Sequence, residues 1–261
     1  MSMTKRIPIQ KITGRSRESF EDLVVIERVI HVFIEKQHAF SATLSDSMID
    51  LFLIGHLFSE GYIQKRTDIL EILPQGDRYD VFLRQGFTPS QIALSRVAKL
   101  ITSACGNVPD NETRVAERVE GVKRFRPEFL LSQMKDFQSS AKVFQETGGV
   151  HRCALSDGER LLFAVEDIGR HNAADKVIGF ILRQEISPND KLLFTTGRIS
   201  MDIVLKALSA GFSGIVSKSA PTDVAVQIAR KNNVLLVGFA RGNRCNLYAG
   251  EDHLDFDTES I

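Results

Sequence analysis

The chain has few cysteines and no net charge. Its 261 residues include three cysteines, Cys105, Cys153 and Cys245, and 33 basic residues balance 33 acidic ones. An odd, sparse set of cysteines does not build a disulfide scaffold, so we expect a reducing, cytoplasmic location in which any of the three could be a working thiol. The absence of net charge argues against a surface that coats nucleic acid, and we expect no nucleic-acid partner.

Long apolar runs are also absent. The first twenty residues contain no apolar segment of the kind that a secretory signal requires. The longest membrane-like run, residues 51–58, is far shorter than the roughly 20 residues of a spanning helix, so we expect no membrane segment. With 43% hydrophobic residues, the chain can still bury a sizeable core, as one large domain or as a main domain plus a smaller one.

Charge is concentrated at the two ends of the chain. Five basic residues precede the first acid, Glu18, and five acids follow Arg244 without a further Lys or Arg. Such ends are typical of solvated tails. We therefore expect residues 1–20 to be a flexible N-terminus and residues 251–261 to be an acidic tail, and we attach no function to either.

Residues 21–100 have the pattern of a small α+β subdomain. Apolar runs at 23–26 and 29–34, and strand-like pieces at 67–73 and 79–83, predict strands. Between them the spacing of apolar residues predicts a helix that is capped by Ser45-Asp46 and runs to about Ser59, with Gly61 as its stop. This segment shows no chemistry, and we expect it to serve packing or dimerisation.

Residues 101–126 predict a mobile loop that carries Cys105. Turn-forming residues follow the cysteine, and a charge-dense run extends from Glu112 to Arg126. A connection of this length in a compact domain is usually functional or mobile. The alternative is that Cys105 is buried and inert, but the residues after it are polar rather than apolar.

Residues 127–250 alternate between helix and strand patterns. A helix opened by Pro127, with apolar positions from Phe129 to Phe144, precedes a predicted hairpin of residues 150–155 and 160–166 around Asp157-Gly158. The pattern then predicts helices at 171–186, 200–210 and 222–231 and strands at 191–195, 214–217 and 234–239. Repeated βα units imply an α/β fold in which helices cover both faces of a parallel sheet, and the hairpin makes that sheet mixed.

Each strand of this half ends in a polar loop. The loops are residues 166–172, 195–200, 217–222 and 239–244. If the strands are parallel, all four loops emerge at one edge of the sheet beside helix N-termini. They would then gather the cations Arg170, Arg198, Lys218, Arg241 and Arg244. Guanidinium groups and free N–H groups suit phosphates, so the loops predict a nucleotide-like anion. The alternative for residues 166–176 is a solvated loop with a helix cap.

Several motifs of nucleotide and metal enzymes are missing. There is no glycine-rich dinucleotide turn and no phosphate loop ending in Gly-Lys-Ser/Thr. Zinc deaminases need His-x-Glu and Pro-Cys-x-x-Cys, whereas His151-Arg152-Cys153 has Cys where Glu is required and no Cys-x-x-Cys exists. His151 and Cys153 could face the same side of a strand, but two ligands make a poor zinc site. We therefore expect no structural metal, a core position for Cys153 and no role for Cys245.

A set of motifs, in order, resembles the FdhD family of formate dehydrogenase accessory sulfurtransferases. The resemblance covers roughly residues 20–250 and includes the helix segment 45–63. The motifs are Gly148-Gly149-Val150-His151, Glu166–Lys176, Thr195–Ser200, Ser217–Thr222 and Gly238–Arg241. The resemblance implies a three-layer α/β/α cytidine-deaminase-like domain without the deaminase zinc, and a homodimer.

The same resemblance implies a function. A member of the family takes sulfur as a persulfide from a cysteine desulfurase and passes it to the bis-guanine-dinucleotide molybdenum or tungsten cofactor, which is then inserted into formate dehydrogenase. Cys105 matches the persulfide carrier. Within the cleft we expect arginines near the phosphates, Asp167 or Asp175 reading guanine N–H groups, and His151 or His171 acting on the thiol. The residues expected to contact the cofactor are His151, Asp167, Gly169, Arg170, His171, Asn172, Asp175, Lys176, Thr196, Gly197, Arg198, Ser200, Ser219, Thr222, Phe239, Ala240, Arg241, Gly242, Asn243 and Arg244.

One departure from the family pattern bears on the mechanism. Many members carry Cys-Gly-x-Cys-Gly in the loop, whereas this chain has Cys105-Gly106-Asn107-Val108-Pro109. A persulfide needs one thiolate, and a second cysteine would help to release sulfur through a disulfide. Loss of that cysteine favours the alternative of a cofactor-binding chaperone without sulfur transfer. A zinc hydrolase of the deaminase type is a more remote alternative.

Overall fold

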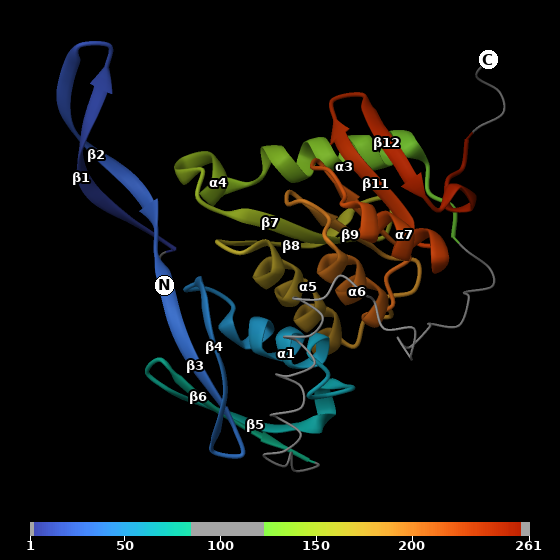
Figure 1. The fold of residues 1–261 in the computed structure, drawn as a ribbon, viewed down its shortest axis with the longest axis horizontal. Coiled ribbons are helices and arrows are strands. Elements are labelled where there is room, and N and C mark those ends of the chain that lie inside the picture. Colours follow the sequence, from blue (N-terminus) through green and yellow to red (C-terminus); the bar gives the residue numbers. More distant parts are fainter. Residues whose placement is uncertain (1–2, 85–122, 257–261) are drawn as a thin grey trace.

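The computed structural model describes residues 3–84 and 123–256, so Cys105 and most of its predicted loop lie outside the described residues. The described residues form three sheets and the helices that cover them (Figure 1). The strands are β1 (Thr4–Thr13), β2 (Ser16–Val25), β3 (Glu27–Ile34), β4 (Gln37–Ser45), β5 (Ile69–Gln75), β6 (Arg78–Leu83), β7 (His151–Ser156), β8 (Leu161–Asp167), β9 (Leu192–Thr195), β10 (Gly214–Ser217), β11 (Leu235–Arg241) and β12 (Arg244–Ala249). The helices are α1 (Ile49–Ser59), α3 (Pro127–Ser139), α4 (Lys142–Thr147), α5 (Arg170–Gln184), α6 (Met201–Ser209) and α7 (Asp223–Lys231), with short 3-10 turns at Arg66–Asp68 and Glu251–His253.

The larger sheet has six strands in the order β12-β11-β10-β9-β7-β8. Its side chains alternate between two apolar clusters. One face, which carries Cys153, Leu193 and Ile215, packs against α5, α6 and α7. The other face, which carries Phe194 and Val216, packs against α3. These are three layers around a mixed sheet, and the α/β class expected from the sequence is confirmed.

The smaller sheet has four strands in the order β4-β3-β6-β5. One of its faces is covered by α1, which contributes Phe52, Leu53 and Leu57 to a shared apolar cluster. The other side of α1 lies against α5, and this is the most extensive contact between two elements in the described part of the chain. Most of α1 is apolar because the helix is buried between a sheet and another helix. It fastens the small subdomain to the α/β domain.

The N-terminus differs from the sequence expectation. Residues 1–20 were expected to be a flexible tail, but β1 and β2 pair in register from Thr4↔Val25 to Thr13↔Ser16. The resulting hairpin projects from the body of the molecule (Figure 1). The isoleucines of β1 stand among charged and polar residues, and Ile9 lies opposite Phe20 of β2. The charged and polar residues interrupt any apolar period, so the sequence pattern did not reveal the two strands.

The start of α1 also corrects a prediction. Ser45-Asp46 was expected to cap the helix, but α1 begins at Ile49 and its N-cap residue, Met48, makes no side-chain cap hydrogen bond. Ser45 instead donates to Asp167 of β8, and Asp46 pairs with Arg28 of β3. The two side chains expected to cap the helix instead bond to residues that are distant in the sequence.

The C-terminal part holds two further corrections. The segment after β11 was read as a loop, yet Arg244–Ala249 returns as β12, antiparallel to β11. The acidic tail was expected to be solvated from residue 251, but His253 and Leu254 are buried, and Leu254 forms a bridge with Phe125. Few apolar residues mark either segment, so the sequence pattern did not reveal them. Among the described residues, no helix has the length and apolar character needed to cross a membrane.

Candidate functional site

The carboxyl ends of four strands lie at one edge of the larger sheet. Strands β9, β10 and β11 are parallel, and β7 is antiparallel to both β9 and β8. Strand β8 therefore runs in the same direction as β9, and the start of β7 lies at the same edge. His151 pairs directly with Asp167 there. The prediction that the four loops share one edge, with His151 beside them, is confirmed.

An open depression of about 270 Å³ lies at this edge, and we call it the cleft. Its walls come from α4 and the turn after it, the start of β7, and the loops that follow β8, β9 and β10. The lining residues are Phe144, Gly148, Gly149, Val150, His151, Ile168, Thr196 and Lys218. The ammonium group of Lys218 lies over the ring of Phe144, 4.9 Å from the ring centroid, so a cation and an aromatic face meet in the lining of the cleft.

Hydroxyl groups hold the loops after β9 and β10 together. Thr195 Oγ1 accepts from the Gly197 amide at 3.1 Å, and Ser217 Oγ donates to the Gly197 carbonyl at 2.7 Å. Thr196 Oγ1 accepts from the Arg152 amide at 2.9 Å, and Ser219 Oγ donates to the Thr196 carbonyl at 2.9 Å. Thr196 and Ser219, both expected to contact the cofactor, thus also shape the loops that form the cleft.

Arg170 bridges two of the loops. It opens α5 and its side chain lies across Gly197, where an added Cβ would come within 2.9 Å of the Arg170 Cβ and Cδ. The glycine is therefore required for this close approach. Within the described part of the chain, the Nε of Arg170 is buried without a hydrogen-bond partner. An unpaired buried donor is costly, and an anion in the cleft could satisfy it.

Two histidines stand in this cationic environment. Burial, Arg170 and Lys218 together lower the pKa of His151, whose Nδ1 lies 3.4 Å from Thr196 Oγ1. Burial, Arg170 and Lys206 lower the pKa of His171, whose Nε2 lies 3.5 Å from Ser200 Oγ. Both imidazoles are therefore neutral at pH 7 and can accept a proton.

The outer rim of the edge carries exposed cations. Arg198, Arg241 and Arg244 are exposed, as are Thr222, Gly242 and Asn243, whereas Ala240 is buried. Arg241 Nε donates to the Lys218 carbonyl at 2.8 Å, which ties the end of β11 to the loop after β10. Beside it, Phe239 has a φ of 51°, a left-handed conformation that is strained for an aromatic residue.

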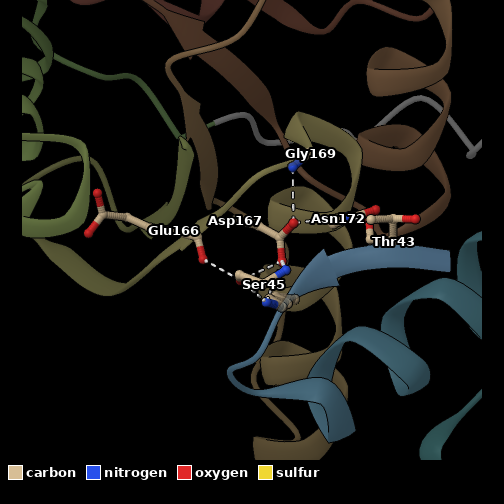
Figure 2. A network of polar contacts seen from close by, with 7 residues as sticks. Thr43, Ser45, Glu166, Asp167, Gly169 and Asn172 are labelled. Atoms are coloured by element: carbon tan, nitrogen blue, oxygen red, sulfur yellow. Dashed lines mark hydrogen bonds and ion pairs between the residues drawn. The ribbon is translucent and has the colours of Figure 1, made fainter. Parts of the chain in front are cut away.

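The structure contradicts the expectation that Asp167 is free to read guanine N–H groups. Its side chain is fully buried, and both carboxylate oxygens already accept hydrogen bonds (Figure 2). Oδ2 accepts from Lys176 Nζ at 2.5 Å and from Ser45 Oγ at 2.9 Å. Oδ1 accepts from the Gly169 amide and from Asn172 Nδ2, each at 3.0 Å. Lys176 is fully buried as well, so neither charge faces the cleft.

Asp175 is also buried and hydrogen-bonded, so it is not available to a ligand. It is 1% exposed, and it accepts from His56 Nδ1 at 3.0 Å, Ser59 Oγ at 2.9 Å and Lys206 Nζ at 2.6 Å. Burial acts to raise the pKa of Asp175, but Lys206 and His56 outweigh it and bring the value to about 2. Asp175 is therefore an ionised structural carboxylate between α1, α5 and α6, and it is not available to a guanine base.

The thiols in the described part of the chain are poor nucleophiles. Cys153 is fully buried, and burial raises its pKa to about 12. Burial also raises the pKa of Cys245, which is half-buried on β12. The predicted core position of Cys153 is confirmed. Within residues 3–84 and 123–256, no three His, Cys, Asp or Glu side chains are grouped so that they could hold a metal ion.

Some residues that line the cleft were not predicted from the sequence. Phe144 and Ile168 had no distinctive signal, because an apolar residue near a helix end or after a strand is ordinarily core. Lys218 was noted as a loop cation but was not counted among the cofactor contacts. A second cavity, of about 390 Å³, lies at the far ends of α1 and α5 and is lined mainly by apolar residues such as Phe58 and Ile181. It lacks the convergent loops of the cleft, which remains the better candidate.

Comparisons with known proteins point to a single family. The FdhD/NarQ family matches residues 25–255 of the chain. A Bacillus licheniformis protein described as sulfur carrier protein FdhD is 33% identical over 248 residues, which cover 90% of this chain and 91% of that protein. A Staphylococcus aureus protein of the same description is 32% identical over 237 residues, 89% of each chain.

A solved structure shares the fold. It comes from Desulfotalea psychrophila and is described as a formate dehydrogenase accessory protein. The two structures superpose with a TM-score of 0.78 over 97% of this chain and 100% of that chain, at 24% sequence identity. The likeness at this identity concerns the arrangement of the elements.

Proposed function

The chain belongs to the FdhD/NarQ family, and we propose that it is a sulfur carrier that works through Cys105 in the cytoplasm. The observation that carries the proposal is the state of the other two thiols. Cys153 is fully buried with a pKa of about 12, and the pKa of Cys245 is raised by burial. Cys105, the remaining cysteine of the chain, is therefore the candidate for the thiolate that carries sulfur.

The loading step needs one thiolate and no external oxidant. The Cys105 thiolate attacks the terminal sulfur of a persulfide on a cysteine desulfurase. The new S–S bond forms on Cys105 as the S–S bond of the desulfurase breaks, and the desulfurase cysteine leaves as its thiolate. His151 and His171, which are neutral at pH 7 because their pKa values are lowered, are suited to accept the thiol proton.

The cleft then receives the cargo, which we propose to be the bis-guanine-dinucleotide molybdenum cofactor on its way to formate dehydrogenase. The residues of the cleft fit the diphosphates of such a ligand. The unpartnered Nε of Arg170, the ammonium of Lys218 and the N-terminus of α5 lie at the same edge. Exposed Arg198, Arg241 and Arg244 add positive charge at the rim. We propose in addition that the protein acts as a homodimer.

A cofactor chaperone without sulfur chemistry is the second candidate. Many members of the family have a second cysteine in this loop, and this chain has Val108 at that position. It therefore lacks the thiol that would release sulfur through a disulfide. Such a chaperone would use the same cleft and would leave Cys105 unmodified.

Persulfide mapping separates the two functions. The protein is incubated with a cysteine desulfurase and cysteine labelled with ³⁵S, and peptides are analysed by mass spectrometry without reductant. A carrier gains one sulfur on the Cys105 peptide, and Cys105→Ala abolishes the gain while cofactor binding persists. Cys245→Ala is the matched control and should load normally. If the Cys105→Ala variant still accepts and passes on labelled sulfur, Cys105 is not the sulfur carrier.

A further inference from the structure

Two neighbouring carboxylates end β8, and they point in opposite directions. Glu166 and Asp167 are consecutive residues of a strand, so their side chains leave opposite faces of the sheet. Figure 2 shows Glu166 turned away from the cluster that surrounds Asp167. Each carboxylate reaches a different wall of the cleft.

Glu166 holds the wall formed by α4. Its carboxylate accepts from the backbone amides of Val143 at 3.1 Å and Phe144 at 2.9 Å. Helix α4 has no side-chain cap of its own, since its N-cap residue is Ala141. Glu166 therefore serves as a cap from another element. The helix that it holds carries Phe144 and leads to Gly148 and Gly149 in the lining of the cleft.

Asp167 holds the loop that enters α5. Its carboxylate accepts five hydrogen bonds, from the Gly169 amide, Asn172 Nδ2, Lys176 Nζ, and the amide and hydroxyl of Ser45. Two of these donors belong to the first turn of α5 or the residue before it. They fix the place at which Arg170 leaves the loop and crosses Gly197.

The small subdomain contributes to the hydrogen bonds around Asp167. Ser45 stands at the end of β4 and donates to Asp167 while its oxygen accepts from Lys176 Nζ at 3.0 Å. The Thr43 carbonyl accepts from Asn172 Nδ2 at 2.9 Å. The end of β4 thus contacts the loop from below (Figure 2). A subdomain with no evident chemistry of its own reaches the cleft through these contacts.

We propose that Glu166 and Asp167 are positioning residues that set the two walls of the cleft, and that the small subdomain acts on the cleft through Asp167. The inference rests on the proposed function for the identity of the ligand. Neither carboxylate contacts the ligand in this scheme, because the protein's own donors occupy both. Their effect on binding passes through Phe144 on one wall and Ile168 on the other, with Arg170 placed just behind Ile168 at the start of α5.

Glu166 allows a test with little risk to the fold, because it is not fully buried. Glu166→Gln keeps one acceptor oxygen for the α4 amides and replaces the other with an NH2 group, whereas Glu166→Ala removes both oxygens. In the Ala variant we expect hydrogen exchange at Val143 and Phe144 to accelerate about tenfold and guanosine diphosphate to bind roughly fivefold more weakly. Glu166→Gln should lie between wild type and the Ala variant in both measurements, because one of the two amides keeps its acceptor. Glu146→Ala, an exposed acid on the same helix, is the control.

The Asp167 arm uses two double variants, so that Lys176 is never left as an unpaired buried charge. Asp167→Asn with Lys176→Met retains an oxygen for the Gly169 amide, and Asp167→Ala with Lys176→Met does not. We expect the first to bind guanosine diphosphate within about threefold of wild type and the second roughly tenfold more weakly. If the second does not fold, Ser45→Ala takes its place and should raise exchange at Gly169.

The outcomes separate the inference from the proposed function. Wild type that fails to bind guanosine diphosphate would count against the ligand, while the exchange rates would still report on positioning. Wild type that binds, with affinity and exchange unchanged in Glu166→Ala and in the Asp167→Ala double variant, would overturn the inference. So would a Glu166→Gln variant that loses affinity although its α4 amides stay protected, because the carboxylate would then contact the ligand.

Discussion

Gly55 of α1 and Gly179 of α5 lie against each other where the two helices cross. A Cβ on Gly55 would stand 1.8 Å from the Asp175 carbonyl oxygen, and a Cβ on Gly179 would stand 2.0 Å from the Leu51 carbonyl oxygen. Each of these positions also lies about 3 Å from the other glycine's backbone nitrogen, at 2.8 Å and 3.1 Å. The two backbones are in direct contact, and this contact joins the small subdomain to the α/β domain.

Alanine at either glycine should destabilise the protein. The clashing atoms belong to backbone, which cannot move aside as a flexible side chain would, so we expect Gly179→Ala to cost about 3 kcal/mol of unfolding free energy. Urea unfolding followed by circular dichroism measures this cost. Gln227→Ala, at an exposed position on α7, should change it by less than about 0.5 kcal/mol. Equal stability of the two variants would mean that the helices do not cross this closely.

The buried carboxylate of Asp175 should make the protein sensitive to acid. Its folded-state pKa of about 2 lies below the ordinary value of 3.8. The stabilisation is therefore complete above about pH 4 and is lost as the pH falls towards 2, with a total of about 2 kcal/mol. Asp175→Asn should remove this component and destabilise the protein by about 3 kcal/mol at pH 7, because Lys206 loses its closest buried partner.

Urea unfolding at a series of pH values tests the Asp175 prediction. Asp136→Asn, an exposed position on α3, is the matched control and should follow the wild-type curve. An Asp175→Asn variant with the same loss of stability between pH 4 and 2 as wild type would assign that loss to other groups.

Cys153 should resist alkylation in the folded protein. Its sulfur is buried and its pKa is about 12, so both access and the thiolate fraction are small. At about pH 8 we expect iodoacetamide to modify Cys153 at least about 100-fold more slowly than in urea. Peptide mass spectrometry at timed intervals gives the two rates. If Cys153 in the native protein reacts at the rate of a free thiol, it would again be a candidate sulfur carrier.

Exposed Arg198 should contribute to anion binding but not to stability. It lies in the loop after β9, beside the cleft residue Thr196, and its side chain is exposed. We expect Arg198→Ala to weaken guanosine diphosphate binding about fivefold, and added salt should reduce the difference. Isothermal titration calorimetry at two salt concentrations measures both effects. Lys231→Ala, at the far end of α7, is the control, and equal losses in the two variants would argue for a nonspecific charge effect.

Much of the architecture was readable from local pattern. Alternating runs of apolar residues predicted the strands and helices between Val150 and Phe239 with small boundary errors, because each strand and helix there carries a strong period of its own. The single helix expected from Pro127 to Phe144 is wrong, since the chain forms two helices there, α3 and α4. The four polar loops and His151 were placed at one edge by the direction of the strands alone. Strand β12 and the β1–β2 hairpin were missed because charged and polar residues interrupt their period.

The sequence alone determined the family, the alternation of strand and helix, and the edge at which a ligand would meet the loops. Tertiary structure decided which polar residues face that ligand. Glu166, Asp167, Asp175 and Lys176 stand in one motif, yet their roles depend on partners such as Ser45 and His56, more than a hundred residues away in the chain. A carboxylate in a loop is a candidate ligand group only while it remains solvated. Long-range donors that bury and satisfy it turn it into a support for the site.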